Sequence, residues 1–173
     1  MRQRSSKEVI KVIKLSPKFK DFLLTETKRD YLEGTTAAGK TTVGITKFML
    51  MVAKSEKKYH LLCGLDLGTV EKNVINSECG LLAQFGVLAN YYSNGKGRIG
   101  LPHIVYDTPT GEKIIYVSGY DNKNRWEKVL GAQYGCVYID EVNIADMEFL
   151  REITHRCQYM MTTSNPDAPD KPV

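Results

Sequence analysis

The sequence predicts an α/β protein whose mainly parallel sheet is flanked by helices. One observation predicts the fold class, and a second predicts the number of domains. Short apolar runs of strand length alternate with segments whose apolar residues recur at helical spacing, and this alternation is typical of parallel sheets covered on both faces. The chain of 173 residues is 42% hydrophobic and 25% charged, which suits one domain with one core.

The first half of the chain carries the signals of two strands and two helical segments. In order, we expect a strand at 28–33, a helix from 39 or 40 to about 53, a strand at 59–65, a mostly helical segment from 69 to about 92, and a loop at 93–100. The first helix is indicated by Val43, Phe48 and Met51 at helical spacing. Gly80 and Gly86 are the expected breaks in the second helical segment, and further glycines mark the loop.

The second half continues the alternation after a hairpin. We expect hairpin strands at 104–106 and 113–117, a short helix at 122–130, a buried strand at 135–139, a helix from 145 to about 157, and a last strand at 159–162. The turn Thr108-Pro109-Thr110-Gly111 is a typical hairpin signal. We interpret this hairpin, near 104–117, as an insertion or an edge element of the sheet.

Composition argues against several classes of protein. The sequence contains no run of about 18 apolar residues and no apolar signal core, so neither a membrane span nor secretion is expected. The four cysteines, Cys63, Cys79, Cys136 and Cys157, lie far apart, which argues against a zinc site or a disulfide framework. Residues 1–30 hold nine Lys/Arg against four Asp/Glu. We therefore expect a basic arm at 1–15, which contacts nucleic acid or another subunit or is only a solvated leader, before a domain at 16–173.

A glycine-rich motif follows the first predicted strand. The residues Gly34, Thr35, Thr36, Ala37, Ala38, Gly39, Lys40 and Thr41 match the phosphate-binding pattern G-x-x-x-x-G-K-[ST] without exception. Its glycines let backbone N–H groups wrap round a phosphate above a helix N-terminus. Lys40 is expected to bridge the β- and γ-phosphates, Thr41 to ligate Mg²⁺, and Thr42 to meet the α-phosphate.

Two carboxylates end the buried strand that follows the hairpin. Asp140 is expected to reach the magnesium shell at the carboxyl edge of the sheet, and Glu141 to act as the general base that polarises the attacking water. This pair favours ATP hydrolysis over phosphoryl transfer by a kinase, which must exclude water. With the glycine loop, it predicts a P-loop NTPase of the additional-strand catalytic-glutamate type.

The last strand ends in polar residues followed by proline. Ser164 and Asn165 precede Pro166, at the position where ring and helicase-like ATPases carry a sensor of the γ-phosphate. We expect the two side chains to hydrogen-bond the γ-phosphate or the attacking water. By itself Asn-Pro is also a common turn signal.

Taken in order, these motifs resemble the ATPase domain of bacteriophage large terminases, the motors that package DNA into procapsids. The resemblance runs from about Ser16 to the C-terminus and rests on the segments 15–19, 34–42, 126–141 and 162–169. Its most specific part is the approach from Trp126 through Gly131 and Tyr134-Gly135 to the carboxylate strand. The resemblance implies that Phe19 lies near the adenine and that Ser164-Asn165 is the coupling motif.

The resemblance also implies cofactors and partners. They are ATP and Mg²⁺, double-stranded DNA, a homo-oligomeric ring on a portal or procapsid, and a small terminase subunit, all in the host cytoplasm. Many terminases carry an arginine inside the phosphate loop or before the glycine that precedes the carboxylate strand, where this chain has Thr35–Ala38 and Leu130. The remaining candidates for an arginine finger are Arg125, Arg151 and Arg156. The alternative interpretation of each is an ordinary helix or surface arginine without a catalytic role.

Three functions therefore stay open. The first is a DNA-packaging ATPase. The second is another P-loop DNA-remodelling ATPase, such as a helicase-like enzyme, and the third is a nucleotide-binding fragment that is not catalytically competent alone. The sequence ends at Val173, before the lid and nuclease domains of large terminases, so we expect no nuclease activity.

Overall fold

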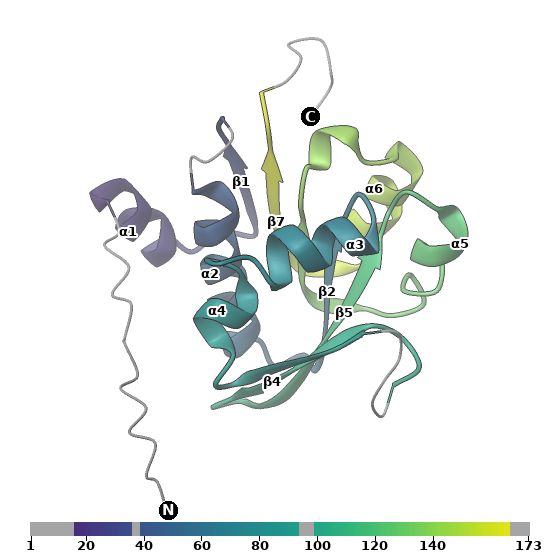
Figure 1. Cartoon of the computed structure of the whole chain (residues 1–173), viewed down its shortest axis with the longest axis horizontal. Coiled ribbons are helices and arrows are strands. Elements are labelled where there is room, and N and C mark those ends of the chain that lie inside the picture. The colour runs from purple at the N-terminus through teal and green to yellow at the C-terminus, as the bar shows by residue number, and fades with distance from the viewer. Residues whose placement is uncertain (1–15, 36–38, 94–98, 167–173) are drawn as a thin grey trace, which may run out of the picture.

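A seven-stranded sheet forms the centre of the computed structural model, which describes residues 16–35, 39–93 and 99–166 (Figure 1). The strands are β1 (Arg29–Glu33), β2 (Tyr59–Gly64), β3 (Ala89–Tyr92), β4 (His103–Thr108), β5 (Gly111–Gly119), β6 (Tyr134–Ile139) and β7 (Cys157–Ser164). The helices are α1 (Pro17–Leu24), α2 (Lys40–Lys54), α3 (Leu67–Val70), which continues as a π-helical turn (Glu71–Ile75), α4 (Leu81–Phe85), α5 (Lys123–Trp126) and α6 (Met147–Thr154). A 3₁₀ turn (Val142–Ile144) follows β6.

The strand order places the functional segments next to one another. The sheet runs β1-β7-β6-β2-β5-β4-β3, and the first five of these strands pair in parallel. Their carboxyl ends therefore meet at one edge, where open α/β sheets bind their ligands. Strand β7 lies between β1, which leads into the glycine loop, and β6, which carries the carboxylates. This is the predicted additional strand.

The predicted hairpin is present and is continuous with the main sheet. β4 and β5 pair antiparallel through Thr108 and Gly111, whose φ of 101° needs a glycine. β4 and β3 complete one edge of the sheet, whereas β5 extends inward and pairs in parallel with β2. The burial of β5 from Lys113 to Gly119 explains this position, because a strand so deeply buried needs a neighbour on each side.

Two differences from the sequence prediction have clear causes. The segment predicted as mostly helical to Tyr92 is broken near Gly80 and Gly86 as expected, but Ala89–Tyr92 forms strand β3, so the prediction was wrong there. β3 is specified by antiparallel pairing with β4, a non-local contact that a local periodicity cannot reveal. Helix α6 ends at Thr154 rather than near Cys157, because Cys157 already pairs with Tyr134 in the sheet.

Helix α1 was not among the expected elements. Its start nevertheless has a signal in the sequence, since Ser16 is the N-cap and Pro17 occupies the first helical turn. The Ser16 hydroxyl accepts a hydrogen bond from the Phe19 N–H at 3.3 Å. In Figure 1 this helix lies outside α2, at the margin of the fold.

The core fills both faces of the sheet, because alternate residues of a strand point to opposite sides. On one face Tyr138 of β6 packs edge-on against Phe48 of α2, with ring centroids 5.7 Å apart. On the other face Val137 and Ile139 pack in a cluster with Phe149 of α6. Figure 1 shows α2 and α4 on one side of the strands and α5 and α6 on the other. The buried β6 therefore holds its carboxyl end rigidly between two packed layers.

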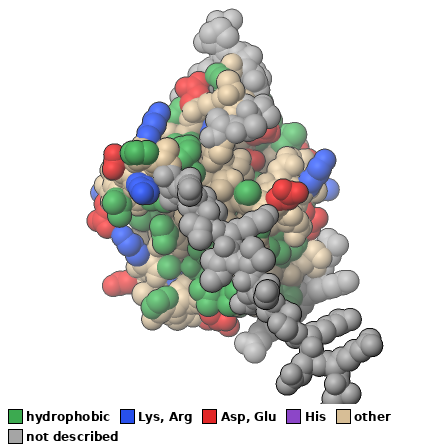
Figure 2. Space-filling model, turned by 60° about the vertical axis from the view of Figure 1, so that its left-hand side comes forward, with side chains coloured by type: hydrophobic (Ala, Val, Ile, Leu, Met, Phe, Trp, Pro, Cys, Tyr) green, Lys and Arg blue, Asp and Glu red, His purple; other side chains and the backbone are tan. Residues whose placement is uncertain are grey.

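The outer surface is of the ordinary mixed kind. On the face shown in Figure 2, Lys and Arg side chains are interspersed with Asp and Glu and with hydrophobic side chains. Within the described residues, no helix is long and apolar enough to cross a membrane.

Gly44 of α2 lies close against strands β6 and β7. A Cβ atom there would lie 3.1 Å from Met161 Cε, 3.3 Å from Tyr138 Cε2 and 3.4 Å from Thr163 Cγ2. We expect Gly44→Val to lower the free energy of unfolding by about 1–3 kcal/mol, because a branched side chain would push α2 off β6 and β7. Urea unfolding measures this loss of stability. Leu50→Val is the matched control, because Leu50 lies on α2 and is 41% exposed. Valine has a higher helix propensity than glycine, so propensity alone predicts a small gain in Gly44→Val. Unchanged or raised stability of this variant would therefore contradict the packing argument.

Candidate functional site

The glycine loop connects β1 to α2 at the carboxyl edge of the sheet. β1 ends at Glu33, and Gly34 and Thr35 lead out of it. Gly39, the residue before α2, has a φ of 78°, a left-handed conformation that favours glycine. Helix α2 begins at Lys40. Thr36, Ala37 and Ala38 lie outside the described residues. The strand–loop–helix arrangement that a phosphate loop requires is therefore present.

Lys40 joins the first and third sequence motifs. Its Nζ donates hydrogen bonds to the backbone oxygens of Gly34 and Thr35, the latter at 3.1 Å, and to Asn165 Oδ1 at 2.6 Å. Asn165 follows β7, the strand adjacent to β1, which is why the two side chains meet. The ammonium group thus lies at the mouth of the glycine loop with three oxygen acceptors around it.

Asn165 extends this connection to the carboxylate strand. Its Nδ2 donates to Glu141 Oε1 at 3.3 Å, so the side chains form a continuous series Lys40–Asn165–Glu141. Asn143, in the turn after Glu141, donates from Nδ2 to the Asn165 backbone oxygen at 3.4 Å. All three predicted motifs are therefore linked by hydrogen bonds at one edge of the sheet.

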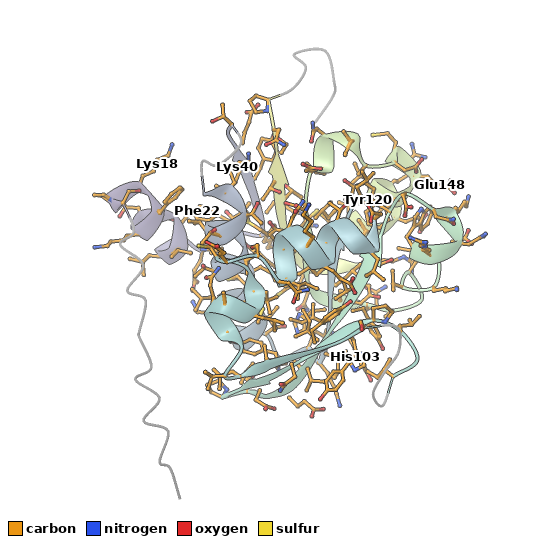
Figure 3. The ribbon with its side chains drawn as sticks, viewed as in Figure 1. Lys18, Phe22, Lys40, His103, Tyr120 and Glu148 are labelled. Carbon is orange, nitrogen blue, oxygen red and sulfur yellow. The ribbon has the colours of Figure 1, made fainter. Side chains whose placement is uncertain are left out.

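Glu141 has an uncommon backbone conformation. Its φ of 54° and ψ of 50° are left-handed, which costs a non-glycine residue of order 1–3 kcal/mol and persists only where the surroundings enforce it. Here its N–H donates to Thr163 Oγ1 at 3.3 Å, and its carbonyl accepts from the Tyr120 hydroxyl at 3.0 Å. Figure 3 shows Tyr120 and Lys40 toward the same end of the fold. The turn directs the Glu141 side chain to Asn165 instead of along the strand.

Asp140 is the buried member of the carboxylate pair. It is 8% exposed, and the Thr163 and Tyr138 hydroxyls donate to its Oδ1 at 2.6 Å and 3.3 Å. Burial raises the pKa of Asp140, and these two hydrogen bonds oppose the shift because they favour the ionised form. A cation beside this carboxylate would likewise favour ionisation.

Thr41 and Asp140 together offer oxygen ligands of the kind that Mg²⁺ prefers. The Tyr138 hydroxyl donates to Asp140, and the side chain of Thr41 of α2 also acts on the pKa of Tyr138, so Thr41 and Asp140 both lie beside this hydroxyl. No group of three or more His, Cys, Asp or Glu that could hold a metal occurs in the part of the chain that the structure describes. Mg²⁺ is commonly held by one or two protein ligands together with phosphate oxygens and water, and Thr41 and Asp140 would be such ligands.

The other predicted site residues have different surroundings. The Ser164 hydroxyl is 2.5 Å from the Tyr31 hydroxyl of β1, so it is engaged within the sheet, unlike the side chain of its neighbour Asn165. The Thr42 backbone oxygen accepts from Gln84 Nε2 at 3.3 Å, which ties the first turn of α2 to α4. Phe19 Cε2 lies 3.9 Å from the position that a Cβ of Gly39 would take, so the Phe19 ring borders the glycine loop.

Three residues of the site were not singled out from the sequence. Tyr138 and Thr163 support Asp140, and Tyr120 supports the backbone of both carboxylates. Their only signal was position, since each occupies or directly follows the carboxyl end of a strand. The contacts of Thr163 and Tyr120 depend on which strands are neighbours, which local patterns do not reveal.

The three candidate arginines lie in separate places. Arg125 forms an exposed ion pair with Asp121 at 3.7 Å, and Arg156 pairs with Glu152 at 3.1 Å. Arg156 directly precedes β7 and is therefore at the opposite end of that strand from Asn165. Arg151 is exposed on α6.

Asp140→Asn is expected to stabilise the metal-free fold while impairing function. The raised pKa means that the folded protein binds this proton more tightly than the unfolded chain. The contribution of Asp140 to stability is thus fully present below its ordinary pKa of 3.8 and is lost as the pH rises through the raised value. At neutral pH the neutral amide relieves the buried charge. Activity at limiting Mg²⁺ should fall by at least about 10- to 100-fold.

Urea unfolding in a chelator, together with magnesium titrations of turnover, measures both effects. Asp107→Asn on β4 is the matched control, because Asp107 is exposed. Lower stability of Asp140→Asn at neutral pH would contradict the argument from burial.

The sheet order and the site together define the class of protein. An additional strand lies between the glycine-loop strand and the carboxylate strand, and Lys40, Asp140 and Glu141 meet at their carboxyl edge. This is the fold of a P-loop NTPase of the additional-strand type. Within that class, the fold is that of the ATPase domain of phage large terminases, as expected from the sequence resemblance.

Solved structures establish this likeness. A large terminase from a thermophilic bacteriophage superposes with a TM-score of 0.72 at 16% identity, over 88% of this chain and 39% of the terminase. The same terminase in complex with ADP gives 0.67 at 18% identity, over 87% and 38%. The ATPase domain of the Thermus phage P74-26 large terminase gives 0.56 at 14% identity, over 91% and 67%. Neither a protein-family model nor a curated protein matches the sequence. The chain thus spans 39% of the first of these terminases, and at these identities the likeness establishes the fold.

Proposed function

We propose that this chain is an ATP-binding and ATP-hydrolysing motor domain of a phage terminase large subunit, dependent on Mg²⁺ and powering DNA translocation into a procapsid. The observation that carries the proposal is the hydrogen-bonded series Lys40–Asn165–Glu141 beside the buried Asp140. It combines a cation at a phosphate loop with a carboxylate suited to accept a proton. The binding of ADP by the thermophilic phage terminase, which has the same fold, supports a nucleotide as the ligand.

Each residue has a defined role in this proposal. Lys40 neutralises phosphate charge, and backbone N–H groups at the start of α2 bind phosphate oxygens. Glu141 accepts the proton of the attacking water. When bound, Mg²⁺ would supply charge stabilisation at the β- and γ-phosphate oxygens, with Thr41 and Asp140 as its protein ligands. Thr163 and Tyr138 hold the Asp140 carboxylate in place.

Asn165 connects occupancy of the loop to the general base. The Lys40 ammonium has three N–H donors, and three acceptors surround it, one of which is Asn165 Oδ1. A triphosphate in the loop would therefore compete with Asn165 for Lys40. Because the same amide donates to Glu141, displacement of Asn165 would alter the position of the base. This supports the role of a coupling residue for Asn165, with Ser164 anchoring it in the sheet through Tyr31.

The proposed partners follow from the terminase fold. They are double-stranded DNA, further copies of the chain in a ring on a portal or procapsid, and a small terminase subunit, in the host cytoplasm. The basic arm at 1–15, which lies outside the described residues, is the proposed contact to DNA or to another copy. Subunit contact is also the proposed source of an arginine finger, which contributes about 10³–10⁵ in rate where one is present.

Steady-state phosphate release across a range of protein concentrations tests the proposal. We expect Mg²⁺-dependent, slow release, because the protein supplies no arginine inside the phosphate loop. If a neighbouring copy supplies the finger, the rate per chain rises with concentration, and Arg125→Ala, Arg151→Ala or Arg156→Ala abolishes the rise. Brisk turnover that is independent of concentration and of all three arginines would show a complete site in one copy. Nucleotide binding without any turnover would favour the alternative of a fragment that is not competent alone.

A further inference from the structure

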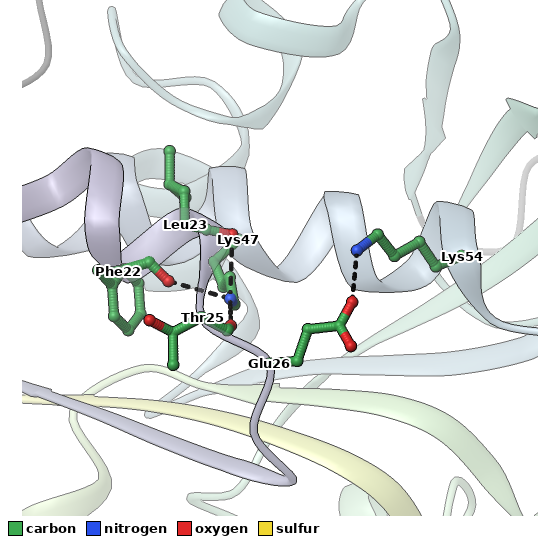
Figure 4. Close-up of polar contacts among 6 residues, drawn as sticks. All are labelled: Phe22, Leu23, Thr25, Glu26, Lys47 and Lys54. Carbon is green, nitrogen blue, oxygen red and sulfur yellow. Dashed lines mark hydrogen bonds and ion pairs between the residues drawn. The ribbon is translucent and has the colours of Figure 1, made fainter.

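Lys47 of α2 is a lysine buried in the junction between α1 and α2. It is 1% exposed, and its Nζ donates hydrogen bonds to the backbone oxygens of Phe22 at 3.0 Å, of Leu23 at 3.1 Å, and of Thr25 (Figure 4). Its Nζ also lies 5.4 Å from the centroid of the Phe22 ring. The three N–H donors of the ammonium thus have three carbonyl acceptors and an aromatic face.

These acceptors belong to the end of α1. The last carbonyls of a helix have no partner within the helix and carry the negative end of its dipole. A buried ammonium satisfies them and favours the helical end electrostatically. Burial lowers the pKa of Lys47, and the nearby Asp30 carboxylate opposes that shift. A buried charge is costly unless it is fully paired. Undocking of α1 would remove the three carbonyl acceptors of Lys47, so the buried ammonium favours the docked position of α1.

The other attachments of α1 are weak. Each of its eight residues is exposed or half-buried, so the helix contributes little to the core. Phe22 packs half-buried between α1 and α2, as Figure 3 shows. Just beyond α1, Glu26 pairs with Lys54 at 3.0 Å, but these side chains are 77% and 63% exposed, and exposed ion pairs stabilise little. Lys47 is therefore the principal anchor of α1 among the described contacts.

The anchored helix also carries Phe19, which borders the glycine loop. The Phe19 ring is half-buried and lies 3.9 Å from the position of a Cβ at Gly39, the residue before Lys40. An aromatic ring at that distance from a phosphate loop offers a flat surface to the base of a nucleotide whose phosphates occupy the loop. Its position is set by how α1 sits on α2.

We infer that Lys47 is a positioning residue for the nucleotide base: by anchoring α1 to α2, it holds Phe19 beside the glycine loop. The inference rests on the proposed nucleotide site and adds to it a residue of α2, about two helical turns from Lys40, that contacts no phosphate. The base is recognised through α1, whereas the phosphates are recognised through the loop. Loss of the anchor therefore weakens ligands that have a base and spares those that consist of phosphates alone.

The test compares Mg-ATP with inorganic tripolyphosphate, which has no base, as ligands of the whole chain in equilibrium binding. Lys47→Met keeps the length of the side chain and removes the ammonium. We expect a roughly tenfold loss of affinity for Mg-ATP and unchanged affinity for tripolyphosphate, the size expected for one base–aromatic contact. In steady-state hydrolysis the KM for ATP should rise while kcat changes little. Lys54→Met, in the same helix, is the matched control and should leave both affinities unchanged.

Phe19→Ala provides a second variant that removes the ring and leaves the α1 anchor intact. It should reproduce the selective loss for Mg-ATP even if Lys47→Met folds poorly. Equal weakening of both ligands by the two variants, or undiminished Mg-ATP affinity in Phe19→Ala, would overturn the inference. A wild-type chain that binds neither ligand would instead overturn the proposed function, and this inference with it.

Discussion

Lys40→Ala is expected to abolish ATP turnover and to weaken nucleotide binding severely. The ammonium is the main positive charge at the glycine loop, and charge-assisted hydrogen bonds to phosphate are among the strongest that a side chain makes. Removing even one preorganised donor from a developing charge costs about 10²–10³ in kcat, and Lys40 supplies both a donor and a charge. Phosphate release and equilibrium binding of Mg-ATP measure the two effects.

Lys54→Ala is the matched control for this prediction. Lys54 ends the same helix, and its side chain is 63% exposed, so its removal changes the net charge equally without touching the site. The Lys40 side chain also bridges Gly34 and Asn165, so its loss could disturb the fold. A circular dichroism spectrum of Lys40→Ala equal to that of the wild type would exclude unfolding as the cause of lost turnover. Hydrolysis at the wild-type rate in Lys40→Ala would mean that the glycine loop does not hold the phosphates.

Glu141→Gln is expected to separate binding from chemistry. The amide keeps the shape of the carboxylate and can still interact with Asn165, but it cannot accept a proton from water. Loss of general-base catalysis costs about 10²–10⁴ in rate. Mg-ATP should therefore bind Glu141→Gln with nearly wild-type affinity while phosphate release disappears in single-turnover and steady-state assays.

Glu148→Gln serves as the control, because Glu148 is exposed on α6 and pairs with Lys123. It should hydrolyse ATP as the wild type does. An unchanged rate in Glu141→Gln would assign the base to another residue and would leave the left-handed conformation of Glu141 without a functional explanation.

The sequence predicted those features that local patterns encode. Strands β1, β2, β6 and β7 and helix α2 were expected nearly within their observed bounds. β2 and β6 are short apolar runs and α2 has apolar residues at helical spacing, whereas β1 was marked by its position directly before the glycine loop. The glycine loop and the carboxylate pair were recognisable because their chemistry requires particular residue types at fixed spacing. The meeting of Lys40 with Asn165, by contrast, depends on β7 being the neighbour of β1.

What the sequence could not supply depends on contacts between distant segments. β3 is a strand because β4 lies beside it, although its own residues continued a helical pattern. Thr163 contacts Asp140 only because β7 and β6 pair in parallel register. Likewise Lys47 has the pattern of an ordinary helix lysine, and only the docking of α1 makes it a buried anchor.

The most direct test of the central claim is an experimental structure of the chain with Mg²⁺ and a slowly hydrolysed ATP analogue. We expect the phosphates to lie over the segment from Gly34 to Thr42, with Lys40 Nζ moved from Asn165 to phosphate oxygens. We also expect Thr41 and Asp140 to be the protein ligands of the metal, and a water to lie within hydrogen-bond reach of Glu141. Nucleotide bound away from the glycine loop, or phosphates that leave Lys40 on Asn165 and the Asp140 carboxylate far from the metal, would contradict the central claim.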